Sequence, residues 1–303
     1  MKKQLQQTSS FLYQTHRYSL LILLLTCCIS TFSQEHFAYI ERGDSLLQLS
    51  LYASEKTEDM PSKRPQSLVL FVHGGGFSSG SRLQRKNVLF CQALKEIGLT
   101  VASIDYRLRQ KNQGFHCDVS IEEKREAIAW AAEDILAAWD YLHNFGYQTV
   151  ILAGSSAGAE AALHAAYHIG SEDIEAVISI AGAMEPAPAD APNIPLLAFH
   201  GECDQLVPYG ESMHHGCPEE SPGALLLQGG GALAHCSAQT RLISYENKGH
   251  ELTGELLSDV DALNTIGSFI SDIRSQSIIA QRIRIASDSD SPCSTPQNLG
   301  PCQ

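Results

Sequence analysis

The sequence has no apolar segment long enough to span a lipid bilayer. Its N-terminal apolar run extends only from Tyr18 to Ile29, whereas a transmembrane helix needs about 20 apolar residues. Two lysines and Arg17 precede this run, and Ser33 follows it as a small residue of the kind found at cleavage sites. This order of charge, apolar run and small residue predicts a signal peptide at residues 1–33.

A cleaved signal peptide implies an exported protein, either periplasmic or secreted, whose mature chain starts near Gln34. Two alternatives stay open at this point. The leader could remain uncleaved, or Cys27 could carry a lipid anchor, although Thr26 before it fits a lipid-attachment motif poorly. In each case we expect no stable membrane span in the mature chain.

Positive charge is scarce in this chain. It has 21 Lys and Arg against 34 Asp and Glu, a formal net charge of -13. A surface this acidic repels phosphate backbones, so we expect no nucleic-acid partner. Hydrophobic residues make up 44% and charged residues 18%, which is typical of a globular domain rather than of a disordered chain.

The sequence also lacks the cysteine patterns of a metal site. It contains no Cys-x-x-Cys and no His/Cys cluster at zinc spacing, so we expect no metal. Of its nine cysteines, seven lie beyond the leader, and an oxidising compartment would favour disulfides among them. We expect Cys217–Cys236 across a glycine-rich insert and Cys293–Cys302 in the tail, with Cys91 a buried free thiol.

Apolar runs alternate with segments of helical periodicity over most of the chain. Predicted strands occupy residues 37–40, 46–52, 67–72, 99–104, 149–153, 174–180, 196–199 and 241–245. Predicted helices occupy residues 83–97, 120–146, 157–169 and 255–274.

The first two predicted strands are joined by a short turn and form an antiparallel hairpin. The later ones are continuously apolar, which is typical of parallel strands buried on both faces. The sequence therefore predicts an α/β fold with a mostly parallel central sheet of about eight strands, flanked by helices on both faces. We place this domain at residues 34–275, and a polar tail outside the core at 276–303.

A Gly-x-Ser-x-Gly pentapeptide at residues 154–158 follows a predicted strand and opens a predicted helix. In this context Ser156 is a candidate nucleophile, because a sharp strand-to-helix turn projects its hydroxyl above the sheet. The helix N-terminus there would also stabilise negative charge. The plainer interpretation, a turn rich in Gly and Ser, explains less of this context.

A second motif, His-Gly-Gly-Gly-Phe at residues 73–77, follows another predicted strand. Glycines let the backbone approach a substrate closely, so the N–H groups of Gly75 and Gly76, with that of Ala157, are candidate donors for an oxyanion hole. We expect His73 to be structural, fixing this loop rather than carrying protons.

A serine nucleophile needs a base, and His250 directly follows the last predicted strand. His200 precedes the candidate acid, which violates the usual Ser, Asp, His order. His214, His215 and His235 lie in the insert, where we expect solvated histidines.

The acid should follow the preceding strand, and Asp204 lies in the segment after it. A carboxylate there would hold the tautomer of the imidazole and stabilise the imidazolium. Glu202 is the reserve candidate, and Asp190 is expected to be a surface acid.

Together these motifs carry a resemblance to a known family. They are HGGGF at 73–77, DYRL at 105–108, GSSAG at 154–158, HGECDQLVP at 200–208 and KGH at 248–250. The chain resembles the esterase and lipase branch of the α/β hydrolases, and is similar to bacterial carboxylesterases with an HGGG motif and to feruloyl or acetyl esterases.

The resemblance covers about residues 37–274. It implies ester hydrolysis through an acyl-enzyme without a cofactor, on a small-molecule or glycan ester. It also implies that Asp105, Tyr106 and Arg107 brace the sheet and the oxyanion loop.

The chain departs from the family pattern at three places. Ala159 stands where many relatives have Gly, Ser50 stands where they often have Asp, and the insert at 209–237 is unusually rich in Gly. These departures concern the substrate more than the reaction. An exopeptidase-like serine hydrolase and a non-catalytic binding protein on the same fold are the alternatives. We prefer ester over peptide because of the HGGG loop and because the chain has no N-terminal propeller domain.

Overall fold

A computed structural model describes residues 34–53, 67–286 and 298–300. The predicted signal peptide and the predicted pair Cys293–Cys302 lie outside these residues. From Glu35 onward the described residues belong to one compact unit.

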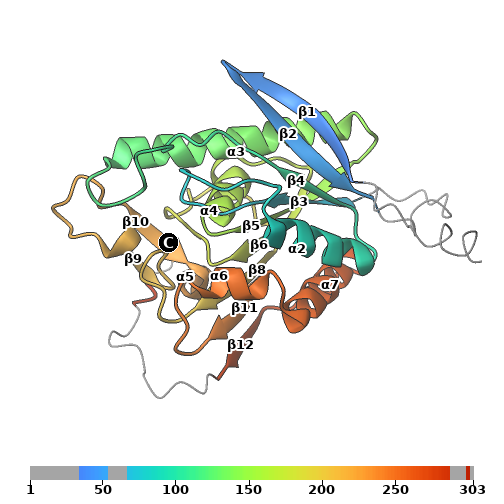
Figure 1. The fold of residues 1–303 in the computed structure, drawn as a ribbon. Coiled ribbons are helices and arrows are strands. Elements are labelled where there is room, and N and C mark those ends of the chain that lie inside the picture. Colours follow the sequence, from blue (N-terminus) through green and yellow to red (C-terminus); the bar gives the residue numbers. More distant parts are fainter. Residues whose placement is uncertain (1–33, 54–66, 287–297, 301–303) are drawn as a thin grey trace, which may run out of the picture. The chain divides into compact units, whose positions relative to one another are not determined.

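Nine strands of the described residues form one sheet, in the order β1-β2-β4-β3-β5-β6-β8-β11-β12 (Figure 1). They are β1 (Glu35–Arg42), β2 (Ser45–Tyr52), β3 (Ser67–Val72), β4 (Val101–Ile104), β5 (Thr149–Ser155), β6 (Ile174–Ile180), β8 (Leu196–Gly201), β11 (Thr240–Tyr245) and β12 (Gln281–Ile285). Strand β2 pairs antiparallel with β1 and with β4, and the other neighbours pair in parallel. The predicted hairpin and the mostly parallel sheet are confirmed.

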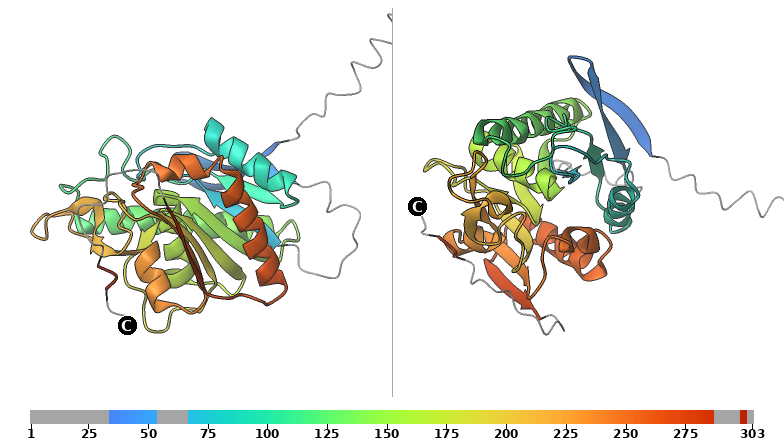
Figure 2. Two further views of the ribbon diagram at one scale, coloured as in Figure 1. Left: turned by 90° about the horizontal axis from the view of Figure 1, so that it is seen from below. Right: turned by 60° about the vertical axis from the view of Figure 1, so that its left-hand side comes forward.

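Helices cover both faces of this sheet (Figure 2). One face carries α3 (Ile121–His143), α4 (Ala157–His164), the π-helix η3 (Ala165–Ile169) and α5 (Gly230–Cys236). The other carries α2 (Arg85–Glu96), α6 (Leu252–Leu256) and α7 (Val260–Arg274). The alternation of β3 explains the two layers, since Leu68 and Leu70 join the first core and Val69 and Phe71 the second.

Helix α3 begins directly after Ser120, which agrees with the predicted helix at 120–146. The side-chain oxygen of Ser120 accepts a hydrogen bond of 3.2 Å from the backbone N–H of Glu123. This bond satisfies one of the donors that a helix N-terminus leaves unpaired. No helix of the described residues is both long and apolar enough to cross a membrane.

The segment predicted as a polar tail contributes a ninth strand to the sheet. Strand β12 pairs in parallel with β11, and all five of its residues are exposed. Arg284 of β12 donates to both carboxylate oxygens of Glu202, at 2.7 Å each. The segment therefore extends the sheet at its edge without entering the core.

Two strands of the insert at 209–237 form a second, smaller sheet with a short strand that follows β6. Strands β9 (Glu211–Met213) and β10 (Leu226–Gly229) pair with each other, and β10 also pairs with β7 (Ala183–Met184). Between β9 and β10 lies the 3-10 helix η4 (His214–Gly216). The insert thus adds a wall beside the carboxyl ends of the main strands (Figure 1).

The predicted disulfide Cys217–Cys236 is wrong, because Cys217 pairs with Cys117. The insert packs against the loop before α3 rather than closing on itself, and the N–H of Gly223 donates to the carbonyl oxygen of Cys117 at 2.9 Å. Cys236 is also disulfide-bonded. Cys91 is free and buried, as predicted, and burial raises the pKa of its thiol to about 12.

Candidate active site

Ser156 lies at the sharp turn between β5 and α4. Its φ is 52° and its ψ is -127°, a backbone conformation that residues other than glycine rarely adopt. A Cβ atom on Gly158 would lie 2.2 Å from the carbonyl oxygen of Val72, and one on Gly154 would lie 2.3 Å from the carbonyl oxygen of Gly158. Both glycines are therefore required where strand and helix approach each other, and the turn presents the Ser156 hydroxyl above the sheet.

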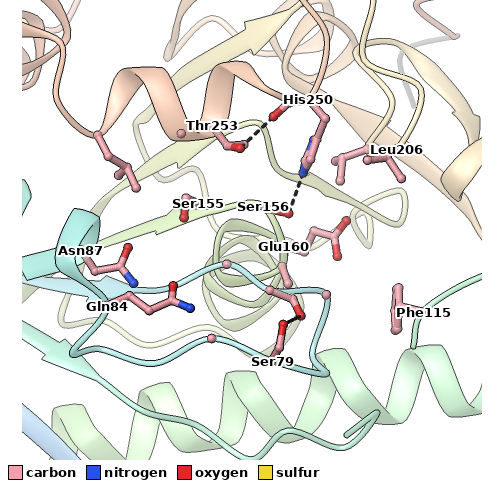
Figure 3. A pocket seen from close by; sticks show the side chains of 18 of the residues that line it. Ser79, Gln84, Asn87, Phe115, Ser155, Ser156, Glu160, Leu206, His250 and Thr253 are labelled. Carbon is pink, nitrogen blue, oxygen red and sulfur yellow. Dashed lines mark hydrogen bonds between the residues drawn. The ribbon is translucent and has the colours of Figure 1, made fainter. Parts of the chain in front are cut away.

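The structure brings Ser156, His250 and Asp204 together (Figure 3). Oγ of Ser156 lies 2.8 Å from Nε2 of His250, and Nδ1 of His250 lies 2.7 Å from Oδ2 of Asp204. With the Nδ1 proton donated to the carboxylate, Nε2 is left to accept the proton of the serine. The three side chains come from the loops that follow β5, β8 and β11.

Asp204 is buried and its carboxylate is held by the backbone. The N–H groups of Leu206 and Val207 each donate to Oδ1 at 3.0 Å. These bonds fix the carboxylate so that Oδ2 is turned toward His250. The reserve acid Glu202 points elsewhere, since it accepts hydrogen bonds from Arg284 and from Ser244.

His200 is a buried support for this acid loop. Its Nε2 donates to the carbonyl oxygen of Val207 at 3.1 Å, and its Nδ1 accepts from the N–H of Gly230 at 3.2 Å. Burial lowers the pKa of His200, so the ring stays neutral at neutral pH. It is excluded as the base, as chain order predicts.

The pKa of His250 results from opposed effects. Burial lowers the pKa, but the hydrogen bond and the negative charge of Asp204 raise it, as does the charge of Glu160. The net pKa lies above its ordinary value of 6.5. A raised pKa makes the imidazole a stronger base toward the serine proton.

The predicted oxyanion-hole residues Gly75, Gly76 and Ala157 all line the pocket at Ser156. None of their N–H groups has an acceptor within the residues that the structure describes. A φ of 131° at Gly75 and of 58° at Gly76 favours glycine at both positions, and at Gly75 an added Cβ would also lie 2.1 Å from the carbonyl oxygen of Ser79. The N–H groups of Ser78 and Ser79 donate to the carbonyl oxygen of Gly75, which fixes the loop.

The loop that carries Gly75 and Gly76 is held in place by the segment that follows β4. His73 donates from Nδ1 to the carbonyl oxygen of Gly74 at 2.8 Å, and its ring stacks on Tyr106 at 4.5 Å between centroids. Tyr106 donates its hydroxyl to the carbonyl oxygen of His73 at 3.0 Å. Asp105 forms a salt bridge with Arg82. Burial lowers the pKa of His73, which fits the expected structural role.

A pocket of about 420 Å³ extends to both sides of Ser156. Gln84, Asn87 and Thr253 lie on one side, and Glu160, Leu206 and Phe115 lie on the other (Figure 3). His214 and His215 from the insert complete this second side. The pocket therefore has room on both sides of the Ser156 hydroxyl.

Sequence reasoning missed the polar residues of the second side. His214 and His215 were expected to be solvated, and this is wrong, because His214 is buried and both line the pocket. His235 is exposed, as expected. For Glu160 the sequence does contain a signal. It is an acid in an alanine-rich helix, and because it comes four residues after Ser156 it lies on the same helix face.

Comparison with known proteins gives matches in fold. A family model described as alpha/beta hydrolase fold matches residues 69–201. The native structure of esterase 2 from the planctomycete Thermogutta terrifontis has 18% identity and a TM-score of 0.53, over 81% of this chain and 93% of that chain. The butyrate-bound form has 18% identity and a TM-score of 0.53, over 79% and 94%. The form phosphoramylated by tabun has the same identity, TM-score and two coverages as the butyrate-bound form. No curated protein matches the chain in sequence.

Proposed function

We propose that this chain, an α/β hydrolase by fold, is a serine hydrolase that cleaves carboxylic esters. One observation carries the proposal. A continuous line of hydrogen bonds runs from Asp204 through His250 to Ser156, and it ends on a strained serine inside a pocket. This arrangement activates a hydroxyl for attack on a carbonyl carbon.

In the proposed reaction, Oγ of Ser156 attacks the ester carbonyl while Nε2 of His250 takes its proton. The carbonyl oxygen becomes an oxyanion, which accepts hydrogen bonds from the N–H groups of Gly75 or Gly76 and of Ala157. Asp204 stabilises the imidazolium that has formed. The C–O bond to the alcohol then breaks, and His250 returns the proton to the departing oxygen, which leaves an acyl-enzyme.

Water completes the cycle. His250 takes a proton from a water molecule, whose oxygen attacks the acyl carbon and forms a second oxyanion in the same hole. Collapse of this intermediate releases the carboxylic acid, and the proton returns to Oγ of Ser156. The steps balance without a cofactor or a metal, because the only groups transferred are a proton and an acyl group.

Short acyl esters are the proposed substrates. A pocket of about 420 Å³, divided by the nucleophile, accommodates a short acyl arm and a modest alcohol arm. The structural relatives support this choice, since the Thermogutta terrifontis enzyme is an esterase with propionate-bound and butyrate-bound forms. Glycan-linked acetyl or feruloyl esters belong to the same proposal.

Export of the mature chain remains part of the proposal. The charged and apolar pattern of residues 1–33 supports it. The disulfide Cys117–Cys217 adds support, because such bonds persist in oxidising compartments.

The proposal is tested by covalent labelling and turnover together. A fluorophosphonate probe is expected to label the purified protein at Ser156, as located by peptide mass spectrometry, and nitrophenyl acetate to butyrate are expected to be hydrolysed. Absence of both labelling and ester turnover would overturn the proposal. Turnover of dipeptide amides without turnover of esters would replace it by a peptidase function.

A further inference from the structure

Glu160 is a buried acid in the wall of the catalytic pocket. It lies one helical turn after Ser156 on α4, and its carboxylate points into the pocket beside the nucleophile (Figure 3). Only 2% of the residue is exposed, and its Oε1 has no hydrogen-bond donor among the described residues. A buried carboxylate oxygen without a donor is unfavourable, and a substrate group that donated to it would remove this cost.

His214 faces the same carboxylate from the insert. Its Nε2 lies 3.2 Å from Oε1 of Glu160, at ion-pair distance but without the geometry of a hydrogen bond, and its own Nδ1 has no partner within the described part. Oε1 of Glu160 and Nδ1 of His214 are therefore two buried polar atoms without a hydrogen bond, on adjacent side chains in the pocket wall. A group that both donates and accepts would satisfy the two of them.

The charges around this spot favour a neutral group over a cation. Lys124 is fully buried, and its Nζ donates to the carbonyl oxygen of Gly223 at 2.7 Å. Burial lowers the pKa of Lys124, and the negative charge of Glu160 only partly opposes this effect. Burial, followed by the charges of His214, Lys124 and His250, lowers the pKa of His215 to about 3. A further positive charge would meet the same unfavourable surroundings.

The wall that carries this spot is held in place. Phe115 and His214 are in ring contact at 5.0 Å, and each lies within three residues of the disulfide Cys117–Cys217. Lys124 lies 5.5 Å from the centroid of the Phe115 ring. Held polar groups discriminate between ligands better than mobile ones, because little ordering is needed on binding.

We propose that Glu160, with His214, binds a hydroxyl group of the ester substrate beside the scissile carbonyl and thereby selects hydroxylated esters. The hydroxyl would donate to Oε1 of Glu160 and accept from the His214 ring. This inference rests on the proposed esterase function. The hydroxyl can belong to a hydroxylated acyl chain or to a polyol or sugar alcohol, and the experiment separates these two sources.

The experiment compares kcat/KM for isosteric pairs of esters. The acyl arm uses nitrophenyl 3-hydroxybutyrate against nitrophenyl 3-methylbutyrate. The alcohol arm uses 2-hydroxyethyl butyrate against propyl butyrate. A hydrogen bond to a buried carboxylate predicts that the wild-type protein prefers the hydroxylated member of one pair on the order of tenfold to a hundredfold.

Variants then assign the preference to Glu160. Glu160→Leu is expected to bring the ratio close to one, and Glu160→Gln to retain part of it through the amide oxygen. Glu172→Gln, an exposed acid outside the pocket, serves as the control and is expected to keep the wild-type ratio. Nitrophenyl acetate, which has no hydroxyl, reports whether each variant retains its catalytic machinery.

Two results would overturn the inference. One is a wild-type ratio of kcat/KM close to one for both pairs of esters. This measurement does not depend on the folding of any variant. The other is a hydroxyl preference that survives unchanged in Glu160→Leu. Either result with nitrophenyl acetate still hydrolysed leaves the esterase function standing, whereas loss of all ester turnover in the wild-type protein refutes that function itself.

Discussion

Asp204 and His250 are separated by 46 residues, yet Oδ2 of Asp204 lies 2.7 Å from Nδ1 of His250. The two loops that carry them follow β8 and β11, which pair in parallel as neighbours in the sheet. Parallel pairing places the carboxyl ends of both strands at one edge, so the two side chains meet without any local sequence relation. The raised pKa of His250 is a direct consequence of this contact.

Replacement of Ser156 by Ala is expected to abolish esterase activity. In the proposed reaction the hydroxyl is the attacking group, so kcat should fall on the order of 10⁶, as in other serine hydrolases. The midpoint of urea unfolding should change little, because Ala retains the Cβ atom and loses only Oγ. Ser258→Ala, on the exposed surface, is the matched control and should keep wild-type turnover. Wild-type turnover of Ser156→Ala would remove Ser156 from the mechanism.

Activity should fall at acidic pH because His250 must be neutral to accept the serine proton. Since the pKa of His250 lies above 6.5, the acid limb of kcat/KM should have its midpoint above pH 6.5. Below that midpoint the imidazole is protonated, and the rate should drop about tenfold per pH unit. A pH profile with nitrophenyl acetate between pH 5 and pH 9 measures this limb (about the range over which His titrates).

Replacement of Asp204 by Asn should shift that acid limb to lower pH. The neutral amide lacks the charge that raises the pKa of His250, and kcat should also fall on the order of 10⁴, as in other triads. Glu202→Gln is the matched control. It breaks a partly exposed ion pair with Arg284 and should leave both the limb and kcat unchanged. A shifted limb in Glu202→Gln with an unshifted one in Asp204→Asn would assign the acid to Glu202 instead.

Removal of the disulfide Cys117–Cys217 should destabilise the protein. The bond closes a loop with a sequence separation of 100 residues, for which chain entropy gives an upper value of about 5 kcal/mol in the free energy of unfolding. The double variant Cys117→Ser with Cys217→Ser is compared with the wild-type protein by urea unfolding at neutral pH.

The same double variant should also lose part of the proposed hydroxyl selectivity, because Phe115 and His214 would no longer be held against each other. Cys91→Ser removes the free buried thiol instead and controls for loss of a cysteine. An unfolding midpoint of the double variant equal to that of the wild-type protein would contradict the predicted destabilisation, and an unchanged ratio of kcat/KM for the ester pairs would contradict the predicted loss of selectivity.

A methyl group on Gly158 should be far more costly than one on Gly267. The added Cβ at Gly158 would lie 2.2 Å from the carbonyl oxygen of Val72, so β3 and α4 would have to separate. We expect Gly158→Ala to lose about 3 kcal/mol or more in the free energy of unfolding.

Gly267 lies within α7, and in Gly267→Ala the new Cβ would meet only Cδ1 of Ile97, at 3.4 Å. Higher helix propensity should then make this variant neutral or stabilise it by about 0.5–1 kcal/mol. Urea unfolding of both variants is the measurement, and equal losses would show that the close approach at Gly158 is unimportant.

The sequence alone determined the fold class and the three residues now placed in one hydrogen-bonded line. Continuous apolar strands separated by amphipathic helices admit few arrangements other than a covered parallel sheet. The turn at Ser156 and the loop at Gly75 and Gly76 depend on local backbone geometry, which glycine spacing reveals directly. His250 and Asp204 followed from their positions after predicted strands.

Only the tertiary structure decided the partner of Cys217, the pairing of β12 and the contact between Glu160 and His214. Each depends on how the insert or the C-terminal segment packs against distant parts of the chain, and no periodicity or spacing encodes such a contact. His214 in a loop resembles any solvated histidine until the insert folds back over the pocket. For the same reason the residues of the proposed reaction could be predicted from the chain, whereas the pocket walls beside Ser156 appear only when the chain has folded.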